Sequence, residues 1–578
     1  MVPQKVWGKI RDGMDHFNVM PSMRIAATAG PAAQRDNVCC YNCAYEPIDG
    51  LQSFSELMFI LMSGTGVGFS VEKENVEKLP AVMNPTGKVR DDYVIEDSRE
   101  GWAKAFLFGL ETWFAGETVV FDYSRIRPYG SPLKAMGGRA SGPEPLKRLF
   151  DETEKLIRHA AGRKLTPLEC HDICCRVAAN VISGGKRRSA MISFSDLDDD
   201  EMRHAKDYPV PVYRYMSNNS AVYKKKPNSA DFMKEWAALA TSGTGERGIL
   251  NVSDLKSVCP MREFKGNERT NPCGEIILRP YEFCNLSEVV VRPKDDISDL
   301  VEKVKTAVWI GVIQSTFTHF PFLRDKWRKN CEEERLIGVS LTGQMDNHDI
   351  LTPEVFKQLR KVAERTAKQA AKRLGINMPR AYTCTKPSGT VSQVVNSASG
   401  CHPRWSRYYI RRYRIAKSDP LFLMLRDQGL PFKPEVRQTR DNFTTAVFEF
   451  PVKSPRKSVL RNEWNAIKQL DWYRRVQKNW STHNVSITIY VKDDEWLKVG
   501  SYVYEHWDEI VGISFFNYNG GKYELAPYQE ITKEQYNKMV ARFPTLDFTQ
   551  LWKYEKITGD TTRASQEFAC AGSSCDIR

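Results

Sequence analysis

The sequence predicts an α/β fold, because segments with helical periodicity alternate with strand-like segments along most of its 578 residues. A helix is expected from Thr352, an N-cap residue followed by Pro353, to a stop at Gly375. A strand is predicted over 485–491, where valine or isoleucine at every second position alternates with serine, threonine and tyrosine. These two patterns are the clearest of the helical and strand signals.

A second helix is expected over the apolar segment 51–62, which runs into a glycine-rich stretch at 63–70. Such glycines let the backbone approach a ligand or another strand closely. A phosphate-binding loop is not indicated, because the Walker lysine and the dinucleotide spacing are both missing. Apolar periodicity ends at about residue 559, so we expect a folded unit over 1–558 and a flexible tail over 559–578.

The composition is that of a globular protein, with 41% hydrophobic and 27% charged residues and a mean hydropathy of −0.47. No apolar run reaches the length of about 18 residues that spans a membrane, and the N-terminus lacks the apolar core of a signal peptide. We therefore expect a cytoplasmic protein without a membrane partner. The formal charge of +13 suits nucleotides or nucleic acid, but basic residues spread over a solvated surface would give the same charge.

Fourteen cysteines carry more information than the charge. Because nothing indicates export, they are expected to be buried apolar groups, metal ligands or redox-active thiols rather than a disulfide framework. The segment Asn271-Pro-Cys-Gly-Glu-Ile276 combines an amide, a thiol and a carboxylate. In an extended chain Asn271, Cys273 and Glu275 would point to one side and face one substrate. A turn with a buried cysteine is the structural alternative.

Two other cysteine groups need an explanation. Cys570 and Cys575 lie on a tail with glycine and serine, where an exposed dithiol could open and exchange as a redox shuttle, with a zinc half-site as the alternative. Cys40 and Cys43 form a C-x-x-C, which alone suggests zinc or a thioredoxin-like pair. No second C-x-x-C stands at zinc-ribbon spacing, and no thioredoxin-like helix start follows. Zinc is therefore the weaker interpretation.

The segment 271–276, followed by Cys284-Asn-Leu, resembles the active-site finger loop of ribonucleotide reductases. The resemblance extends along nearly the whole chain and is greatest to the adenosylcobalamin-dependent class, especially its monomeric members, which share the C-terminal cysteine pair. The other matching segments, in chain order, are 20–24, 66–70, 97–102, 126–130, 140–143, 185–190, 217–220 and 386–390.

This resemblance implies a ten-stranded α/β barrel with a central finger loop whose tip, Cys273, carries a thiyl radical. Glu275 would accept the proton of the ribose 3′-hydroxyl, and Asn271 would hold the ribose hydroxyls. Cys43 and Cys284 would form the reducing pair and end as a disulfide. The remaining cysteines would have packing roles, among them Cys39, Cys40, Cys174 and Cys175.

The resemblance also implies partners and binding residues. Cys570 and Cys575 would reduce the active-site disulfide and be reduced by thioredoxin or a glutaredoxin-like carrier. The segment 387–390 has the composition of a helix N-terminus, where backbone N–H groups bind phosphate. The residues implied in substrate binding are Ser22, Pro387, Ser388, Gly389 and Thr390. Those implied in a specificity loop that answers to a deoxynucleotide effector are Gly185, Lys186, Arg187, Arg188 and Ser189, for which a solvated basic loop is the alternative.

The chain departs from the family pattern at two places. The first barrel segment begins only twenty residues in, no ATP-cone segment is visible, and the effector-binding insertion before Asp97 looks shortened. We therefore expect either a minimal enzyme or one of which a part is encoded separately, with an effector site made by a homodimer. Secondly, Phe515 and Phe516 stand where metal-dependent reductases carry paired tyrosines. Phenylalanine has no acidic hydroxyl to relay a proton-coupled electron, which favours adenosylcobalamin as the radical source.

Two alternatives stay open at this point. One is the large subunit of a metal-dependent reductase that needs a separate radical-generating subunit, with a rerouted relay through Tyr518, Tyr523 and Tyr528. The other is a basic nucleic-acid-binding protein with a cysteine-held zinc. That reading leaves the segment 271–275 and the tail dithiol unexplained, so we expect no direct nucleic-acid binding. Whether the substrate is a di- or triphosphate does not follow from the sequence.

Overall fold

The computed structural model describes residues 2–555 except 132–139, 184–185, 188–189, 208, 243, 418, 437 and 519–524. Within them, ten strands follow one another around a barrel built from two parallel halves. The first half is β2 (Cys43–Pro47), β3 (Gly66–Ser70), β8 (Met191–Asp196), β9 (Ser217–Tyr223) and β10 (Gly248–Asn251). The second half is β13 (Glu282–Val290), β14 (Ile337–Thr342), β15 (Thr383–Cys384), β19 (Thr488–Val491) and β20 (Gly512–Asn517).

The two halves meet in antiparallel pairs, β2 with β13 and β10 with β20. The second half is completed by a parallel bridge between Thr385 and Val485, which connects the strands β15 and β19. The predicted ten-stranded barrel is thereby confirmed. The predicted strand 485–491 is too long, since β19 begins at Thr488. The segment before it makes a single bridge, at Val485, and the side chains of Asn484 and Ser486 bond the carbonyl groups of Gly274 and Cys273.

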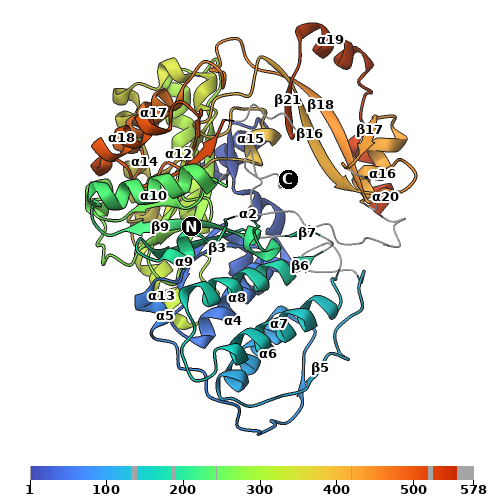
Figure 1. Ribbon diagram of the computed structural model, residues 1–578. Helices are drawn as coiled ribbons and strands as arrows, with labels where there is room; N and C mark the ends of the chain where they lie inside the picture. The colour runs from blue at the N-terminus through green and yellow to red at the C-terminus, as the bar shows by residue number, and fades with distance from the viewer. Residues whose placement is uncertain are drawn as a thin grey trace.

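Amphipathic helices cover the outside of the barrel (Figure 1). The predicted helix 51–62 is confirmed as α4. The helix predicted after Thr352 is α14, where Thr352 accepts a hydrogen bond from the Val355 N–H (3.3 Å) and Gly375 ends the helix with φ +68°. The main outer helices are α4 (Leu51–Met62), α6 (Arg99–Phe114), α7 (Glu144–His159), α8 (Pro167–Asn180), α10 (Ser229–Ser242), α12 (Ile297–Gln314), α14 (Pro353–Leu374), α17 (Ala466–Asn479) and α18 (Trp496–Glu505).

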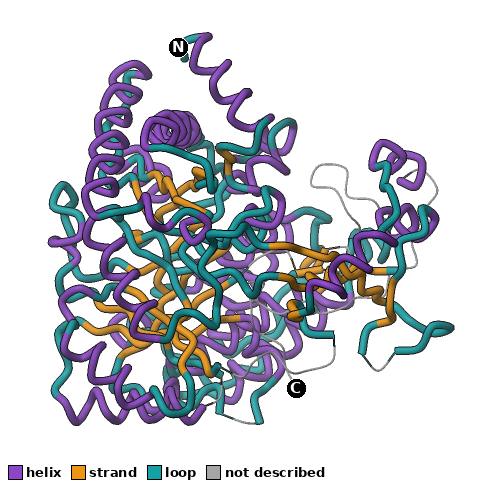
Figure 2. Tube along the Cα trace, turned by 90° about the horizontal axis from the view of Figure 1, so that it is seen from above, coloured by secondary structure: helices purple, strands orange, loops and turns teal. Residues whose placement is uncertain are grey.

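A second, four-stranded antiparallel sheet lies beside the barrel and was not predicted (Figures 1 and 2). It packs a small apolar core of its own around Phe422 and Phe448. The sheet consists of β17 (Phe432–Pro434), β18 (Thr445–Lys453), β16 (Tyr408–Ala416) and β21 (Tyr528–Glu530), accompanied by α16 (Pro420–Asp427), α19 (Lys533–Arg542) and α20 (Leu551–Glu555). Within the described ranges, no helix combines the length and apolarity needed to cross a bilayer.

Candidate active site

A short hairpin, β11 (Arg269–Thr270) with β12 (Ile277–Leu278), enters the barrel and carries the segment 271–276 at its tip. Its path runs past the glycine-rich strand β3. A side chain at Gly68 would overlap the carbonyl oxygen of Thr270, and one at Gly66 would come within 3.0 Å of Pro272 Cγ. The glycines of this stretch therefore make room for another strand, which was one of the two roles expected for them.

Buried ion pairs hold both strands of this hairpin. The Arg269 guanidinium donates to both carboxylate oxygens of Glu72 at 2.6 and 2.7 Å, and neither side chain is exposed. On the other strand, Arg262 donates to the Ile277 carbonyl at 2.6 Å and pairs with Glu334. Removing one partner of such a pair leaves a buried charge uncompensated and costs about 3–5 kcal/mol. The hairpin therefore holds its tip rigidly.

The tip is a β-turn over Asn271–Gly274, closed by the Gly274 N–H donating to the Asn271 carbonyl at 2.8 Å. Pro272 and Gly274 occupy the second and fourth positions, which these residue types favour. The expectation that Asn271, Cys273 and Glu275 share one face of an extended chain is therefore wrong. Asn271 and Glu275 instead meet across the turn, where Asn271 Nδ2 donates to Glu275 Oε2 at 3.0 Å. Cys273 is exposed at the apex.

Lys386 joins the thiol and the carboxylate of the finger. Its Nζ donates to Glu275 Oε1 at 3.1 Å and lies 3.9 Å from Cys273 Sγ. Burial lowers the pKa of Lys386, but the negative charges that Cys273 and Glu275 can carry outweigh burial and keep the pKa above its usual value. Lys386 is therefore a cation held between the two groups. Sequence reasoning placed Lys386 in a matching segment without giving it a role.

The structure brings Cys43 and Cys284 together. They are register partners on the antiparallel strands β2 and β13, and both are fully buried. Partners in an antiparallel pair have Cα atoms about 4.5–5.5 Å apart, which is within the range that a disulfide requires. Burial raises the pKa of both thiols well above the usual value, and Glu275 raises that of Cys43 further. The pair thus lies in the barrel interior within electrostatic reach of the finger.

A cavity of about 450 Å³ opens above the finger tip. Cys273 borders it, whereas Asn271, Glu275, Cys43 and Cys284 are buried behind its wall. All five predicted substrate-binding residues border the same cavity, namely Ser22, Pro387, Ser388, Gly389 and Thr390. Asn218 and Ser220 on β9 also line this cavity. A small molecule held by the segment 387–390 would therefore lie against the exposed thiol.

Comparisons with known proteins agree with this architecture. A family model described as the insertion domain of B12-dependent ribonucleotide reductase matches residues 70–157. Adenosylcobalamin-dependent ribonucleoside-triphosphate reductases from Lactobacillus gasseri and Lactobacillus leichmannii are 28% and 29% identical, each over 84% of this chain and 75% of its own length. The crystal structure of a B12-dependent (class II) ribonucleotide reductase superposes with a TM-score of 0.82 at 24% identity, over 96% of this chain and 89% of the other.

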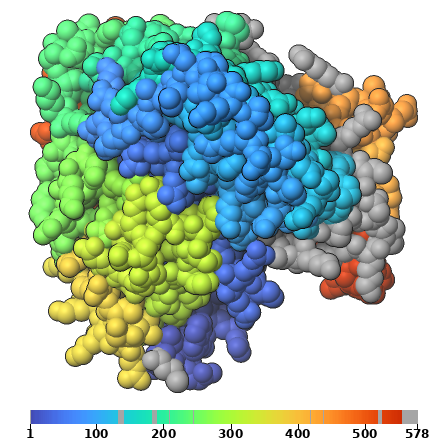
Figure 3. All heavy atoms as spheres, turned by 90° about the horizontal axis from the view of Figure 1, so that it is seen from below, coloured from blue at the N-terminus to red at the C-terminus, as the bar shows by residue number. Residues whose placement is uncertain are grey.

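The chain belongs to the adenosylcobalamin-dependent ribonucleotide reductases. The family model places the insertion domain over residues 70–157, and the expectation that this insertion is shortened before Asp97 stays a prediction. The insertion carries α6 and α7, whose blue-to-cyan surface covers much of the lower face in Figure 3. The effector site made by two copies rested on that expectation and stays a prediction as well.

The segment 387–390 leads into a helix, as expected, with Thr390 as the N-cap of α15 (Val391–Val394), which has only four residues. The turn before this helix is held by Ser388, which has φ +53°, accepts from the Ser392 N–H at 3.2 Å and donates to Glu288 Oε2 at 2.5 Å. Burial raises the pKa of Glu288 from 4.5 to about 7. Sequence reasoning missed Glu288, although its alternation with Cys284 and Leu286 along one strand would have placed it inside the barrel.

An aromatic rim borders the cavity on the side of β19 and β20. Phe515 and Phe516 contribute to it, at the positions where metal-dependent reductases were expected to carry tyrosines. Arg461 places its guanidinium 4.2 Å from the ring centroid of Trp405 and 4.6 Å from that of Tyr490. Its Nε is buried and has no hydrogen-bond partner among the described residues. The Arg461 Nε–H is thus a desolvated hydrogen-bond donor beside two aromatic rings.

Some of the predicted residues lie outside the described part of this reductase: Gly185, Arg188, Ser189, Tyr523, Cys570 and Cys575. The backbone of Lys186 and Arg187 forms β7, which pairs with β6 (Ile182–Ser183), so the expected specificity loop includes a hairpin. The cysteines assigned packing roles, Cys39, Cys40, Cys174 and Cys175, are buried in one apolar cluster. Among the residues that the structure describes, no group of three or more metal-ligating side chains is placed to hold an ion.

Proposed function

We propose that this reductase converts ribonucleotides into 2′-deoxyribonucleotides by thiyl-radical chemistry at Cys273, with adenosylcobalamin as the source of the radical. The observation that carries the proposal is the register pair Cys43–Cys284 in the barrel interior, behind a rigid finger that exposes Cys273. We infer a triphosphate substrate, because the relatives from L. gasseri and L. leichmannii bear the name of ribonucleoside-triphosphate reductases.

The finger residues account for activation of the substrate. An S–H bond and a ribose C–H bond are similar in strength, so a Cys273 thiyl can take the 3′-hydrogen atom reversibly. Glu275 accepts the 3′-hydroxyl proton while Asn271 holds the hydroxyls, and Lys386 keeps the Glu275 carboxylate in place. The four side chains act together because one turn and one cation connect them.

The buried thiols account for the reduction. Cys43 and Cys284 supply two hydrogen atoms as the 2′-hydroxyl leaves as water, and their sulfurs join in a disulfide. Cys273 then returns its hydrogen atom to C3′ and regains the thiyl state. The stoichiometry is one ribonucleotide and two thiols converted into one deoxyribonucleotide, one water and one disulfide. The strand register supports this step, because the two Cα atoms already have the spacing that a disulfide needs.

The aromatic rim fits a large, amide-bearing cofactor. Arg461 Nε is a buried donor without a partner among the described residues, and an amide carbonyl of a corrin ring could accept from it. Trp405 and Tyr490 would give apolar contact beside it. When bound, adenosylcobalamin would supply the radical that takes the hydrogen atom of the Cys273 thiol and leaves a thiyl. Phe515 and Phe516 make the alternative, a tyrosine relay from a separate metal subunit, the less favoured source.

The remaining parts of the scheme extend the same proposal. Cys570 and Cys575 would reduce the Cys43–Cys284 disulfide by exchange, with thioredoxin or a glutaredoxin-like protein as the external reductant. A deoxynucleotide effector would act through residues 185–189. We expect a cytoplasmic setting, where thiols are kept reduced, and leave a homodimer as one possible assembly.

Anaerobic turnover of the full chain tests the proposal. Ribonucleoside triphosphate, dithiothreitol and adenosylcobalamin should yield deoxynucleotide, and omission of the cofactor should abolish the product. Cys273→Ser should abolish turnover and retain nucleotide binding, whereas Cys170→Ala, on the outer helix α8, should retain turnover. Product formed without adenosylcobalamin would overturn the radical source, and sustained turnover by Cys273→Ser would overturn the radical residue.

A further inference from the structure

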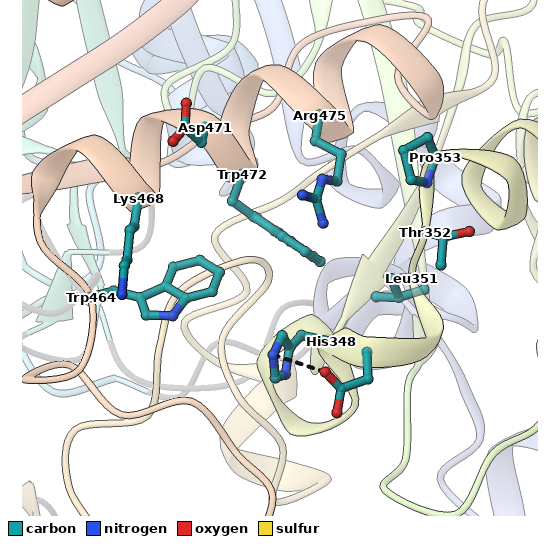
Figure 4. A pocket seen from close by; sticks show the side chains of 10 residues that line it. His348, Leu351, Thr352, Pro353, Trp464, Lys468, Asp471, Trp472 and Arg475 are labelled. Atoms are coloured by element: carbon teal, nitrogen blue, oxygen red, sulfur yellow. Dashed lines mark ion pairs between the residues drawn. The ribbon is translucent and has the colours of Figure 1, made fainter.

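A second cavity of about 520 Å³ lies on the outer surface of the barrel, between α17 and the turn that precedes α14 (Figure 4). Its volume is within the range of small-molecule sites. Trp464, Trp472 and His348 contribute rings to it, and Lys468 and Arg475 contribute cations. These residues belong to the outer shell of the molecule, and the proposed catalytic scheme uses none of them.

The rings make two walls of this pocket. The indoles of Trp464 and Trp472 have centroids 5.8 Å apart, and the His348 imidazole lies 6.2 and 6.4 Å from them. Trp472 is 4% exposed, and its Nε1 donates to Gln344 Oε1 at 2.9 Å, so its orientation is fixed from behind. Trp464 is half-buried. Such a preformed aromatic surface favours a flat, apolar ring as its occupant.

The charges around the pocket leave its cations available. In the part of the chain that the structure describes, neither Lys468 nor Arg475 forms an ion pair, and the Arg475 guanidinium stacks 5.1 Å from the Trp472 ring centroid. The carboxylates are engaged already. Asp349 pairs with His348 Nε2 at 3.2 Å, and Asp471, which also lines the pocket, accepts from the Tyr502 hydroxyl.

The second nitrogen of the His348 ring takes no part in this surface, because His348 Nδ1 is buried and has no hydrogen-bond partner among the described residues. The pocket therefore combines aromatic walls with two cations. A heteroaromatic ring that carries an anionic group matches both features.

We propose that this pocket is a further nucleotide-binding site, separate from the substrate cavity and from the specificity loop, in which the base packs against Trp464 and Trp472 and the phosphate is bound by Lys468 and Arg475. Charge-assisted hydrogen bonds to two cations make the phosphate the main source of affinity. The site goes beyond the proposed reduction, because binding here involves neither Cys273 nor the cavity above it.

Counting bound nucleotide tests the inference without any dependence on turnover. Equilibrium dialysis of the full chain with radiolabelled ATP should find one site more in the wild type than in the double variant Lys468→Ala/Arg475→Ala, or binding weaker by about tenfold or more in that variant. Lys478→Ala, an exposed lysine one turn further along α17, is the matched control and should leave ATP binding unchanged. Both altered cations are exposed, so the double variant should fold.

A second measurement follows the rings directly. ATP should quench tryptophan fluorescence in the wild type, and Trp464→Leu should lose that part of the quench. Adenosine, which lacks phosphate, should bind about tenfold or more weakly. Equal numbers of ATP sites and equal affinities in the wild type and the double variant would overturn the proposal, as would adenosine binding as tightly as ATP. Because neither assay measures reduction, failure of the proposed catalytic function would leave this result unaffected.

Discussion

Cys43 and Cys284 face each other across the antiparallel joint between the two halves of the barrel. Each half supplies one thiol, β2 from the first and β13 from the second. The pair therefore exists only when the two halves have come together. Because the strand register sets the Cα separation, the two sulfurs can join without a change in the barrel backbone.

The first prediction concerns this pair. In a single turnover without external reductant, the wild type should lose two titratable thiols for each deoxynucleotide formed, because the two cysteines become a disulfide. Cys284→Ser and Cys43→Ser should form no disulfide and lose multiple turnover while still binding nucleotide. Thiol titration after denaturation, with Cys170→Ala as the control, measures the change. Loss of two thiols per product in Cys284→Ser would show that other cysteines supply the electrons.

The sequence could predict the parts of the fold that depend on local signals. The helix after Thr352 follows from an N-cap, a proline and a terminal glycine that lie close to it in the chain. The finger segment 271–276 could be recognised because its residues are contiguous. The pairing of Cys43 with Cys284 needed the family resemblance, since the contact is made by strands far apart in the sequence.

The features that were missed depend on tertiary contacts. The turn at Asn271–Gly274 replaces the expected extended chain, because Pro272 and Gly274 favour a turn at the end of a hairpin. The contact between Lys386 and Glu275 forms only when the segment after β15 packs against the finger. The four-stranded sheet beside the barrel combines strands at 408–453 with β21 at 528–530, and no local sequence pattern predicts that pairing.

The second prediction concerns the base. Glu275→Gln keeps an acceptor for the Asn271 amide but can no longer take up the 3′-hydroxyl proton, so hydrogen abstraction at C3′ should slow by about 10²–10⁴-fold. Release of tritium from 3′-labelled substrate measures the step separately from reduction. Glu505→Gln, an exposed residue on α18, is the control. An unchanged rate of tritium release in Glu275→Gln would remove it as the base.

The third prediction concerns the tail. Cys570→Ser should block turnover that is driven by thioredoxin, because exchange with the buried Cys43–Cys284 disulfide then lacks its shuttle. Turnover with dithiothreitol should persist, since a small dithiol can enter the cavity beside Cys273. Steady-state rates with the two reductants provide the comparison. If both reductants fail equally in the variant, the tail cysteines are not a shuttle.

The last prediction follows from Glu288, whose buried carboxyl accepts a hydrogen bond from the Ser388 hydroxyl at the turn before α15. Burial raises its pKa from 4.5 to about 7, so the folded state holds this proton more tightly than the unfolded state does. The stability contributed by this group is therefore fully present below pH 4.5 and is lost as the pH rises through 7. A shift from 4.5 to about 7 corresponds to about 3 kcal/mol.

Glu288→Gln removes that titration and keeps an oxygen to accept from Ser388. The wild type should thus lose about 3 kcal/mol of unfolding free energy relative to Glu288→Gln between pH 4.5 and pH 8. Urea unfolding of both proteins at the two pH values gives the double difference, in which the titrations that they share cancel. Glu505→Gln should follow the wild type. If the wild type and Glu288→Gln lose stability in parallel over this range, Glu288 does not hold a proton in the folded barrel.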